Sequence, residues 1–352
     1  MRAGEIADQL WRGDGWLAAA ARLTLAPLEA GYGAATALRN ALYDRGMLRI
    51  LRSPLPAVSI GNLTVGGTGK TPVSAWIASE LRAGGARPAI VMRGYGDDEP
   101  DVHRRLHPDI PVIASRDRLA GAYEALSLGA DIVVLDDAFQ HRRLNRNLDI
   151  VLISADAWTR RIRLLPAGPW REGLASLERA SIAVITRKAA SHTRADSVRQ
   201  RLHAAFPTLP VATMHLALDE IRRASDDERR PLASLDGAAV AAVAGVGDPW
   251  AYVQQLELAG ARVRPSIYPD HFRFDASEVR TLAASVRADE LPLCTLKDAV
   301  KLAPLWPRAA PALWYVSQRV VVEDGVGALH ALLEVLLRAR HSIPVRAGPA
   351  AD

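Results

Sequence analysis

The segment 57–72 constrains the fold of this 352-residue chain more than any other. A short apolar run at residues 57–60 precedes a turn that contains Gly66, Gly67 and Gly69, and a helical pattern follows over residues 72–81. Glycines in such a turn let consecutive backbone N–H groups point inward at an anion. The start of the helix adds unsatisfied N–H groups and the positive end of its dipole. The segment therefore predicts a phosphate-binding loop between a strand and a helix.

The side chains of this loop are suited to binding a nucleoside triphosphate. Lys70 would place a compact positive charge on the β- and γ-phosphates, and the Thr71 hydroxyl would ligate Mg²⁺. Thr64 stands where the Walker A pattern has its first glycine, so the formal pattern fails at one position while its physical requirements are met. The residues expected to bind the nucleotide, which the resemblance given below implies to be ATP, are Thr64, Val65, Gly66, Gly67, Thr68, Gly69, Lys70 and Thr71.

Lysine is rare in this chain. The 44 Lys and Arg residues include only Lys70, Lys188, Lys297 and Lys301 as lysines. Lysine is a compact point charge, whereas arginine is a planar fork, and the two are not interchangeable at a phosphate. The position of Lys70 inside the loop therefore supports a catalytic role, while chance is the simpler interpretation of Lys188.

Two adjacent carboxylates supply the expected metal partner. Asp136 and Asp137 directly follow the apolar run 132–135, at the carboxyl end of a predicted strand, where α/β sheets bind their ligands. Two neighbouring carboxylates repel each other unless a cation lies nearby. We expect Thr71, Asp136 and Asp137 to form the Mg²⁺ site, with Asp136 the better metal partner and Asp137 sensing the γ-phosphate.

Short apolar runs alternate with helical patterns along most of the chain. Because these runs are apolar throughout, they indicate a mainly parallel sheet covered on both faces. The predicted fold is a P-loop NTPase-like α/β domain, joined to a second, smaller α/β domain and an N-terminal helical segment. The predicted parts are a membrane-associating helical segment 1–52, a P-loop domain 53–215, a linker 216–235, a C-terminal α/β domain 236–340 and a tail 341–352.

The composition limits the cellular compartments and the classes of binding partner that fit this chain. The single cysteine, Cys294, excludes a disulfide framework and an Fe–S cluster. No run reaches the ~18 apolar residues of a membrane span, and no signal-peptide pattern is seen, so we expect a cytoplasmic protein. Apolar and basic residues alternate within 16–52, which suggests a helix at a membrane surface, although a helix packed on its own domain is an equal alternative. Aromatic content of 5% argues against nucleic acid.

Arginine is concentrated between residues 141 and 171. This density suits an acidic substrate or anionic lipid headgroups, while an ordinary solvated surface is the alternative for any single arginine. The seven arginines are Arg142, Arg143, Arg146, Arg160, Arg161, Arg163 and Arg171.

Six segments together resemble the tetraacyldisaccharide 4′-kinase family, the lipid A 4′-kinases. They are residues 61–72, 93–96 (Arg-Gly-Tyr-Gly), 136–144 (Asp-Asp-Ala-Phe-Gln-His-Arg-Arg-Leu), 165–169, 269–271 and 295–301. The resemblance implies an active site in a cleft between two domains and a helix on the inner leaflet of the inner membrane, facing the cytoplasm. It implies transfer of the ATP γ-phosphate to the 4′-hydroxyl of an acylated glucosamine disaccharide 1-phosphate, a step of lipopolysaccharide biosynthesis.

The resemblance also implies a catalytic pair. Asp98, within Asp97-Asp98-Glu99-Pro100, corresponds to the family's proposed base, and His271 corresponds to the histidine that assists it. Asp97 replaces the family's usual glycine, and a spacer usual after Gly96 is absent, so the choice between Asp97 and Asp98 stays open with Asp98 favoured. A charged turn is the other interpretation. The residues expected to contact the substrate are Arg93, Tyr95, Gln140, His141, Arg142 and Arg171.

A second class of function is compatible with the phosphate loop alone. A nucleotide-dependent switch or metal-insertion factor would use hydrolysis to change a protein partner, and it would predict a dimer without lipid affinity. The apolar and basic N-terminus favours the lipid kinase. The oligomeric state is left open, and the remaining histidines, among them His103, show no metal-ligand spacing and carry no expected role.

Overall fold

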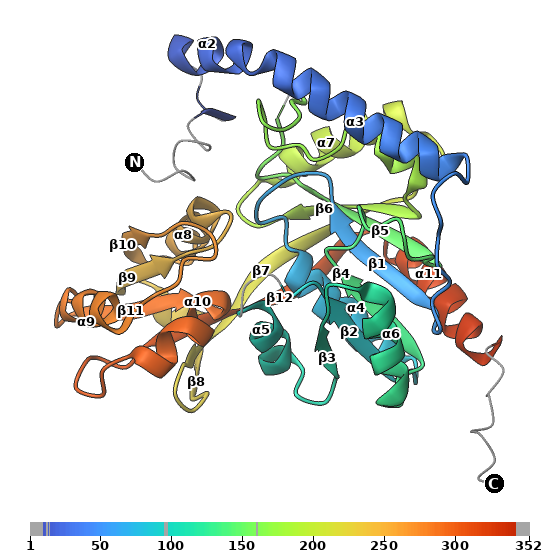
Figure 1. Ribbon diagram of the computed structural model, residues 1–352. Coiled ribbons are helices and arrows are strands. Elements are labelled where there is room, and N and C mark those ends of the chain that lie inside the picture. Colours follow the sequence, from blue (N-terminus) through green and yellow to red (C-terminus); the bar gives the residue numbers. More distant parts are fainter. Residues whose placement is uncertain (1–9, 12, 14, 95–97, 160, 343–352) are drawn as a thin grey trace, which may run out of the picture.

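The computed structural model describes residues 10, 11, 13, 15–94, 98–159 and 161–342. Within this part of the chain, twelve strands form one sheet in the order β10-β9-β11-β12-β7-β6-β5-β1-β4-β2-β3, with β8 paired to β7 (Figure 1). The strands are β1 Ala57–Asn62, β2 Pro88–Met92, β3 Val112–Ala114, β4 Ile132–Asp136, β5 Leu148–Ser154, β6 Ile182–Arg187, β7 Val211–Arg223, β8 Arg229–Pro231, β9 Ala239–Ala244, β10 Arg262–Ile267, β11 Glu290–Thr295 and β12 Trp314–Asp324. The helices are α2 Trp16–Thr24, α3 Ala26–Asp44, α4 Lys70–Ala83, α5 Glu99–Leu106, α6 Arg118–Ser127, α7 His192–Ala205, α8 Pro249–Leu258, α9 Ala276–Ala284, α10 Leu296–Leu302 and α11 Val326–Ala339.

The larger half of the sheet confirms the predicted fold class. Strands β6, β5, β1, β4, β2 and β3 pair in parallel. Every residue of β1, β2, β4 and β6 is buried, which explains why these runs are apolar throughout. Helices α4 and α11 pack on one face of this half, and α6 and α7 pack on the other.

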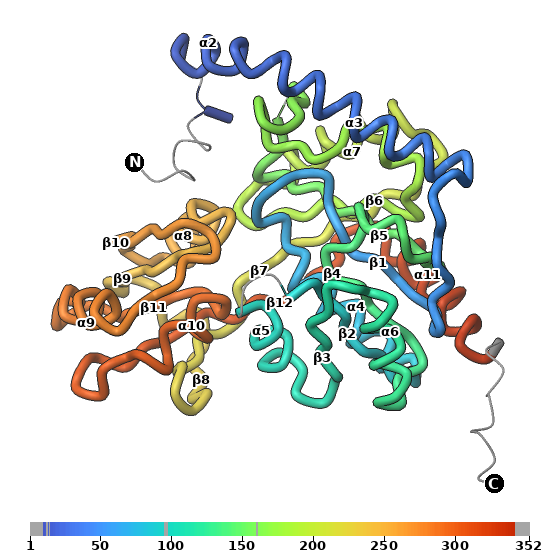
Figure 2. Tube along the Cα trace, in the orientation of Figure 1, coloured from blue at the N-terminus to red at the C-terminus, as the bar shows by residue number. Residues whose placement is uncertain are grey.

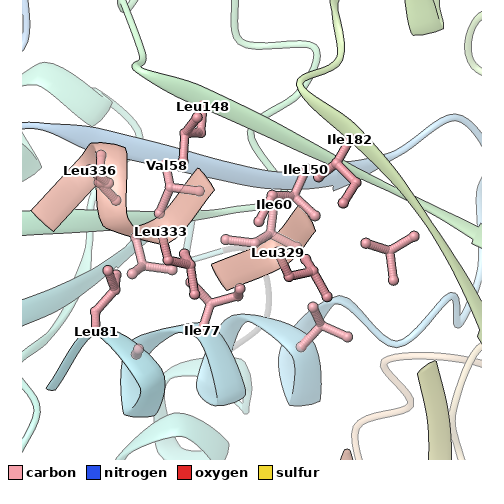
Figure 3. Close-up of a cluster of buried hydrophobic side chains, with 14 of the residues drawn as sticks. Val58, Ile60, Ile77, Leu81, Leu148, Ile150, Ile182, Leu329, Leu333 and Leu336 are labelled. Carbon is pink, nitrogen blue, oxygen red and sulfur yellow. The ribbon is translucent and has the colours of Figure 1, made fainter. Parts of the chain in front are cut away.

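The last helix packs on the first half of the molecule, although the sequence placed it in the second. Leu329, Leu333 and Leu336 of α11 join the core formed by Ile77 and Leu81 of α4 under the parallel strands (Figure 3). The chain reaches this position because β12 is eleven residues long and carries it back across the molecule, as Figure 2 traces. The periodicity of a helix shows that it has an apolar face, but not which core that face covers.

Residues 216–235, expected as a linker, lie largely within the sheet. They comprise the second half of β7, then β8, then a short 3₁₀ turn at Leu232–Leu235. β7 pairs antiparallel with β12 from Thr213 to Arg223, with register shifts before Gln318 and Asp324, so backbone hydrogen bonds join the two halves along most of these strands. The segment is polar because its charged side chains are ion-paired at the surface, as with Arg222 and Glu220.

The order of the strands determines where a ligand can bind. β1 lies between β4 and β5, and β9 lies between β10 and β11, so the connections leave each of these strands toward opposite sides. In α/β sheets such a reversal opens a crevice at the carboxyl ends of the strands, and ligands bind there. The loop after β1 is the predicted phosphate loop, and it lies opposite the loop after β9.

The N-terminal helices α2 and α3 lie across the first half and contain no buried residue (Figure 1). They are attached by polar contacts: Tyr32 Oη donates to the Arg171 carbonyl at 3.0 Å, and Glu29 Oε1 accepts from the Leu164 N–H at 2.7 Å. Large apolar side chains on the two helices are exposed to solvent, namely Trp16, Leu17, Leu23, Leu28 and Leu38. In the part of the chain that the structure describes, no helix combines the length and the apolar character needed to cross a bilayer.

The position of α11 makes a testable prediction about stability. Leu333→Ala removes a side chain that is 4% exposed, so the free energy of unfolding should fall by about 2–5 kcal/mol. Val335→Ala, in the same helix but 54% exposed, should change it by less than about 0.5 kcal/mol. Denaturant unfolding of both variants measures these values, and equal small losses would contradict the packing of α11 on this core.

Candidate active site

A cavity of about 920 Å³ opens where the two halves of the sheet face each other. The phosphate loop and the ends of α4 and β4 form one side. The loops after β9, β10 and β11 form the opposite side. All of the predicted ATP-binding residues line the cavity except Thr64, whose carbonyl accepts a hydrogen bond from Asn62 Nδ2 at 2.7 Å.

The backbone of the phosphate loop needs its glycines. Gly66 has φ 111° and Gly69 has φ 87°, values that side-chain-bearing residues rarely adopt. A Cβ on Gly69 would also lie 2.2 Å from Leu216 Cδ1. Asn62 and Thr186 each hydrogen-bond to Thr68 of the loop. Asn62 Nδ2 donates to Thr68 Oγ1 at 2.9 Å, and Thr186 Oγ1 donates to the Thr68 carbonyl at 2.9 Å. The loop is therefore fixed before any ligand binds.

Lys70 projects from the start of α4 toward acceptors at the ends of β1 and β4. Its Nζ lies 3.4 Å from Asn62 Oδ1 and 3.8 Å from Asp137 Oδ1. Asp137 has φ 48°, and its carboxylate also receives Arg171 Nη1 at 3.1 Å. The structure thus brings together three residues that were assigned to the site from separate motifs, with both cations directed at one carboxylate.

Asp136 is buried beside a histidine that carried no role in the sequence. His103 Nε2 on α5 lies 2.9 Å from Asp136 Oδ2, and both side chains are almost completely buried. Burial opposes ionisation of Asp136, but the hydrogen bond and charge of His103, together with Lys70, keep its pKa below the usual range. No residue spacing links positions 103 and 136, because the contact arises only when α5 packs over the end of β4.

Glu99 is a second acidic residue that the sequence did not assign. It lines the cavity, and burial together with the negative charge of Asp136 raises the pKa of its carboxyl. Lys297 Nζ lies 3.9 Å from Glu99 Oε1. Glu99 directly follows Asp98 in the Asp-Glu-Pro run, so the motif that pointed to Asp98 also contained this cavity-lining residue.

Asp98 and His271 come from opposite halves of the molecule and meet beside the cavity; His271 lines it, whereas Asp98 is buried and is not part of its wall. His271 Nδ1 lies 3.5 Å from Asp98 Oδ1, and Lys301 Nζ lies 3.8 Å from Asp98 Oδ2. Burial disfavours the Asp98 carboxylate, but the hydrogen bond with His271 and the charges of Lys297 and Lys301 outweigh burial and lower its pKa to about 2. The same hydrogen bond raises the pKa of His271. The Asp98 carboxylate therefore stabilises the imidazolium form of His271.

The residues predicted to contact the substrate divide into two groups. Arg93, Gln140, His141 and Arg171 line the cavity. Burial and the positive charge of Arg118 lower the pKa of His141 to about 4, so its imidazole is neutral at physiological pH. Tyr95 and the alternative base Asp97 lie outside the described residues.

Arg142 does not line the cavity, contrary to its predicted contact with the substrate. Its guanidinium donates to the Asn40 carbonyl at 2.9 Å and to Asp44 Oδ1 at 2.5 Å, and it stacks on the ring of Tyr43. Arg142 therefore attaches the end of α3. Other arginines of the 141–171 segment are also paired inside the protein, Arg146 with Asp149, Arg163 with Glu29 and Arg171 with Asp137. These four pairs favour the structural interpretation of that charge density.

Lys188 joins the two sides of the cavity, although the sequence suggested no role for it. Its Nζ donates to the Gly67 carbonyl at 2.9 Å and lies 4.0 Å from Asp248 Oδ2 in the loop after β9. The backbones also touch here, because a Cβ on Gly247 would lie 2.5 Å from the Gly67 nitrogen. Absence of a side chain at position 247 thus permits close contact between the phosphate loop and the second half.

The oxygen atoms available at the phosphate loop are suited to ligating Mg²⁺ that is bound together with a nucleotide. Asp136 Oδ1 is buried and has no hydrogen-bond partner in the described part of the chain, and Thr71 lines the same wall. Among those residues no group of three or more His, Cys, Asp or Glu side chains forms a metal cluster. Mg²⁺ at phosphate sites needs only one or two carboxylates, because phosphate oxygens and water complete its shell.

Comparison with known proteins identifies the family. The family model described as "LpxK: Tetraacyldisaccharide-1-P 4'-kinase" matches residues 21–109 and 97–337. The chain belongs to this family. It is 36% identical to the tetraacyldisaccharide 4′-kinase of Azoarcus sp. (strain BH72), over 95% of this chain and 96% of that one. It is 38% identical to the same enzyme of Anaeromyxobacter dehalogenans (strain 2CP-1), over 92% of each chain.

A solved structure of the family agrees with the fold. The "apo" form of LpxK from Aquifex aeolicus in complex with ATP superposes with a TM-score of 0.69 at 28% identity, covering 90% of this chain and 99% of that one. Family membership decides between the two classes of function left open by the phosphate loop. The chain belongs to a family of kinases that act on an acylated disaccharide, so the switch or metal-insertion interpretation is set aside.

The Asp98–His271 contact predicts how the histidine titrates. Because the Asp98 carboxylate stabilises the imidazolium, the pKa of His271 should lie above 6.5, and Asp98→Asn should lower it. The matched control is Asp101→Asn, an exposed position on the same helix, which should leave the titration unchanged. Nuclear magnetic resonance of the imidazole C–H signals against pH measures both values. An unchanged His271 pKa in Asp98→Asn would show that the two groups do not interact.

Proposed function

We propose that this protein transfers the γ-phosphate of ATP to the 4′-hydroxyl of an acylated glucosamine disaccharide 1-phosphate in lipopolysaccharide biosynthesis. The observation that carries the proposal is that the phosphate loop with Lys70 and His271, the partner of Asp98, line one cavity. A donor phosphate on residues 66–71 and an alcohol beside His271 could therefore meet there. In the transfer, the alcohol oxygen bonds to the γ-phosphorus, and the bond from that phosphorus to the β–γ bridging oxygen breaks.

Each group on the phosphate side has a separate task in this proposal. The loop N–H groups and Lys70 bind the phosphate oxygens and balance their charge, which is the main catalytic requirement of phosphoryl transfer. Thr71 and Asp136 would hold Mg²⁺, with Asp137 adjoining them. Bound Mg²⁺ neutralises phosphate charge. His103 holds the Asp136 carboxylate through Oδ2, which leaves Oδ1 available as a ligand.

The acidity of the catalytic pair decides where the alcohol proton goes. With a pKa of about 2, the Asp98 carboxylate orients the hydroxyl but is too weak a base to keep its proton. The proton passes to His271 in its neutral form, because the raised pKa makes this imidazole the stronger base of the pair and the Asp98 carboxylate stabilises the imidazolium that forms. Because the phosphoryl transition state is loose, positioning of the alcohol matters more than early proton removal.

The exposed apolar side chains of α2 and α3 support peripheral contact with the cytoplasmic leaflet of the inner membrane. Trp16 is 77% exposed and Leu23 is 73% exposed. Apolar side chains on an interfacial helix are stabilised when they enter the boundary between headgroups and acyl chains. α3 also passes over the cavity wall, since Tyr32 lines the cavity. An acylated substrate could therefore keep its chains in the membrane while its sugar enters the site.

Transfer of label from γ-labelled ATP tests the proposed reaction. With the acylated disaccharide 1-phosphate and Mg²⁺, wild-type protein should place label in the lipid fraction, and Lys70→Ala should lower the rate about a hundredfold or more. Arg82→Ala, on the same helix but half exposed, should keep the wild-type rate. Release of labelled inorganic phosphate without labelled lipid would contradict the kinase and restore the switch interpretation.

Flotation with anionic vesicles tests the membrane contact. Replacing Trp16, Leu17 and Leu23 together by serine should move most of the protein from the vesicle fraction to the soluble fraction, because the variant loses its exposed apolar surface. ATP binding should be unchanged. A control variant with serine at Leu126 and Leu128, exposed in and after α6, should float like the wild type. Equal flotation of all three proteins would contradict a role for α2.

A further inference from the structure

Two buried polar side chains on α8 line the cavity without a role in the phosphate or acceptor chemistry. Tyr252 and Gln255 are three residues apart, so they lie on the same face of the helix. They are 4% and 6% exposed, and both form part of the cavity wall. Buried polar groups in folded proteins are nearly always hydrogen-bonded, so an unpaired one in a cavity wall requires an explanation.

The orientation of the Gln255 amide is fixed by the backbone of β7. Its Nε2 donates to the Leu216 carbonyl at 2.8 Å, so the remaining atom, Oε1, is an acceptor. Gln255 Oε1 has no hydrogen-bond partner in the described part of the chain, and the same holds for the Tyr252 hydroxyl. Burial raises the pKa of Tyr252 well above its usual range, so this hydroxyl stays protonated. A ligand here must therefore bring an N–H donor to Gln255.

This wall lies beside the phosphate loop. Leu216, whose carbonyl holds Gln255, also approaches Gly69 of the loop. Lys188 lines the same region with its side chain while its Nζ is held on the Gly67 carbonyl. Val246 and Val316 add apolar surface. A flat aromatic group could pack on this surface with its polar edge toward Tyr252 and Gln255 of α8. Ligand pockets are commonly apolar with a few polar groups that give specificity.

The acceptor chemistry is built on different elements from the wall of α8. The Asp98–His271 pair is built from α5 and the loop after β10, and the wall beneath α3 carries Tyr32 and Arg171. In a nucleotide the base and the γ-phosphate are at opposite ends of the triphosphate. If the γ-phosphate faces Asp98, the base extends to another wall of the cavity. The wall of α8 is adjacent to the loop, and two of its polar groups have no hydrogen-bond partner among the described residues.

We propose that Tyr252 and Gln255 form the base subsite of the nucleotide, and that Gln255 Oε1 accepts a hydrogen bond from the 6-amino group of adenine. The inference rests on the proposed kinase function in one respect, namely that the triphosphate binds to residues 66–71. Guanine carries a carbonyl oxygen where adenine carries the amino group. That oxygen would face Gln255 Oε1, acceptor to acceptor, so the subsite selects ATP over GTP.

Equilibrium binding of two nucleotides tests the subsite directly. Purine riboside triphosphate differs from ATP only by lacking the 6-amino group. Calorimetric titration of wild-type protein should give about tenfold weaker binding of purine riboside triphosphate than of ATP, because a buried acceptor stays unpaired. Gln255→Met should bind the two nucleotides equally, within about twofold. Gln254→Met, the exposed neighbour on α8, should discriminate like the wild type.

Equal binding of ATP and purine riboside triphosphate by the wild-type protein would overturn the inference without any variant. Unchanged discrimination in Gln255→Met, with a native circular dichroism spectrum, would also overturn it. These titrations contain no lipid, so they separate the two proposals. Discrimination that depends on Gln255, with no transfer of label to lipid, would refute the kinase function and keep the subsite. Transfer of label to lipid without discrimination between the two nucleotides would support the kinase function and refute the subsite.

Discussion

The antiparallel pairing of β7 with β12 is the constraint on which the rest of the structure depends. These two long strands belong to both halves at once, so their backbone hydrogen bonds fix the position of one half-sheet relative to the other. Each half has its own strand-order reversal, and the pairing turns both crevices toward a single cavity. The site is thus a consequence of strand order, because neither half supplies both the phosphate loop and His271.

The two halves of the molecule approach each other closely at this cavity because glycines meet there and because charged side chains are paired. The contact of Gly247 with Gly67 is backbone against backbone, which leaves no room for a side chain. Around it, Lys70, Lys188, Lys297 and Lys301 all lie at the site, and each has an acidic or carbonyl partner. In a chain that otherwise uses arginine almost exclusively, lysine is retained where one compact charge must fit beside a phosphate or a carboxylate. The chance interpretation of Lys188 is therefore less satisfactory than a role at the phosphate loop.

The sequence was sufficient to predict the parts of the site that are local. Gly66 to Thr71 and Asp136-Asp137 are contiguous, each follows a strand, and their physical requirements are visible in the residue order. The parts that depend on packing could not be predicted. The contact of His103 with Asp136 arises because α5 covers the end of β4, and α11 joins the first core because β12 carries the chain back to it. Arg142 was predicted to contact the substrate because it lies in a basic segment, yet the arrival of α3 beside it supplies Asp44 as its partner.

The meeting of donor and acceptor chemistry in one cavity is the central claim, and a crystal structure with Mg²⁺ and a non-hydrolysable ATP analogue tests it most directly. We expect the triphosphate to lie on the backbone N–H groups of residues 66–71, with its terminal phosphate directed at Asp98 and His271. A nucleotide bound elsewhere, or a terminal phosphate directed away from that pair, would contradict the claim.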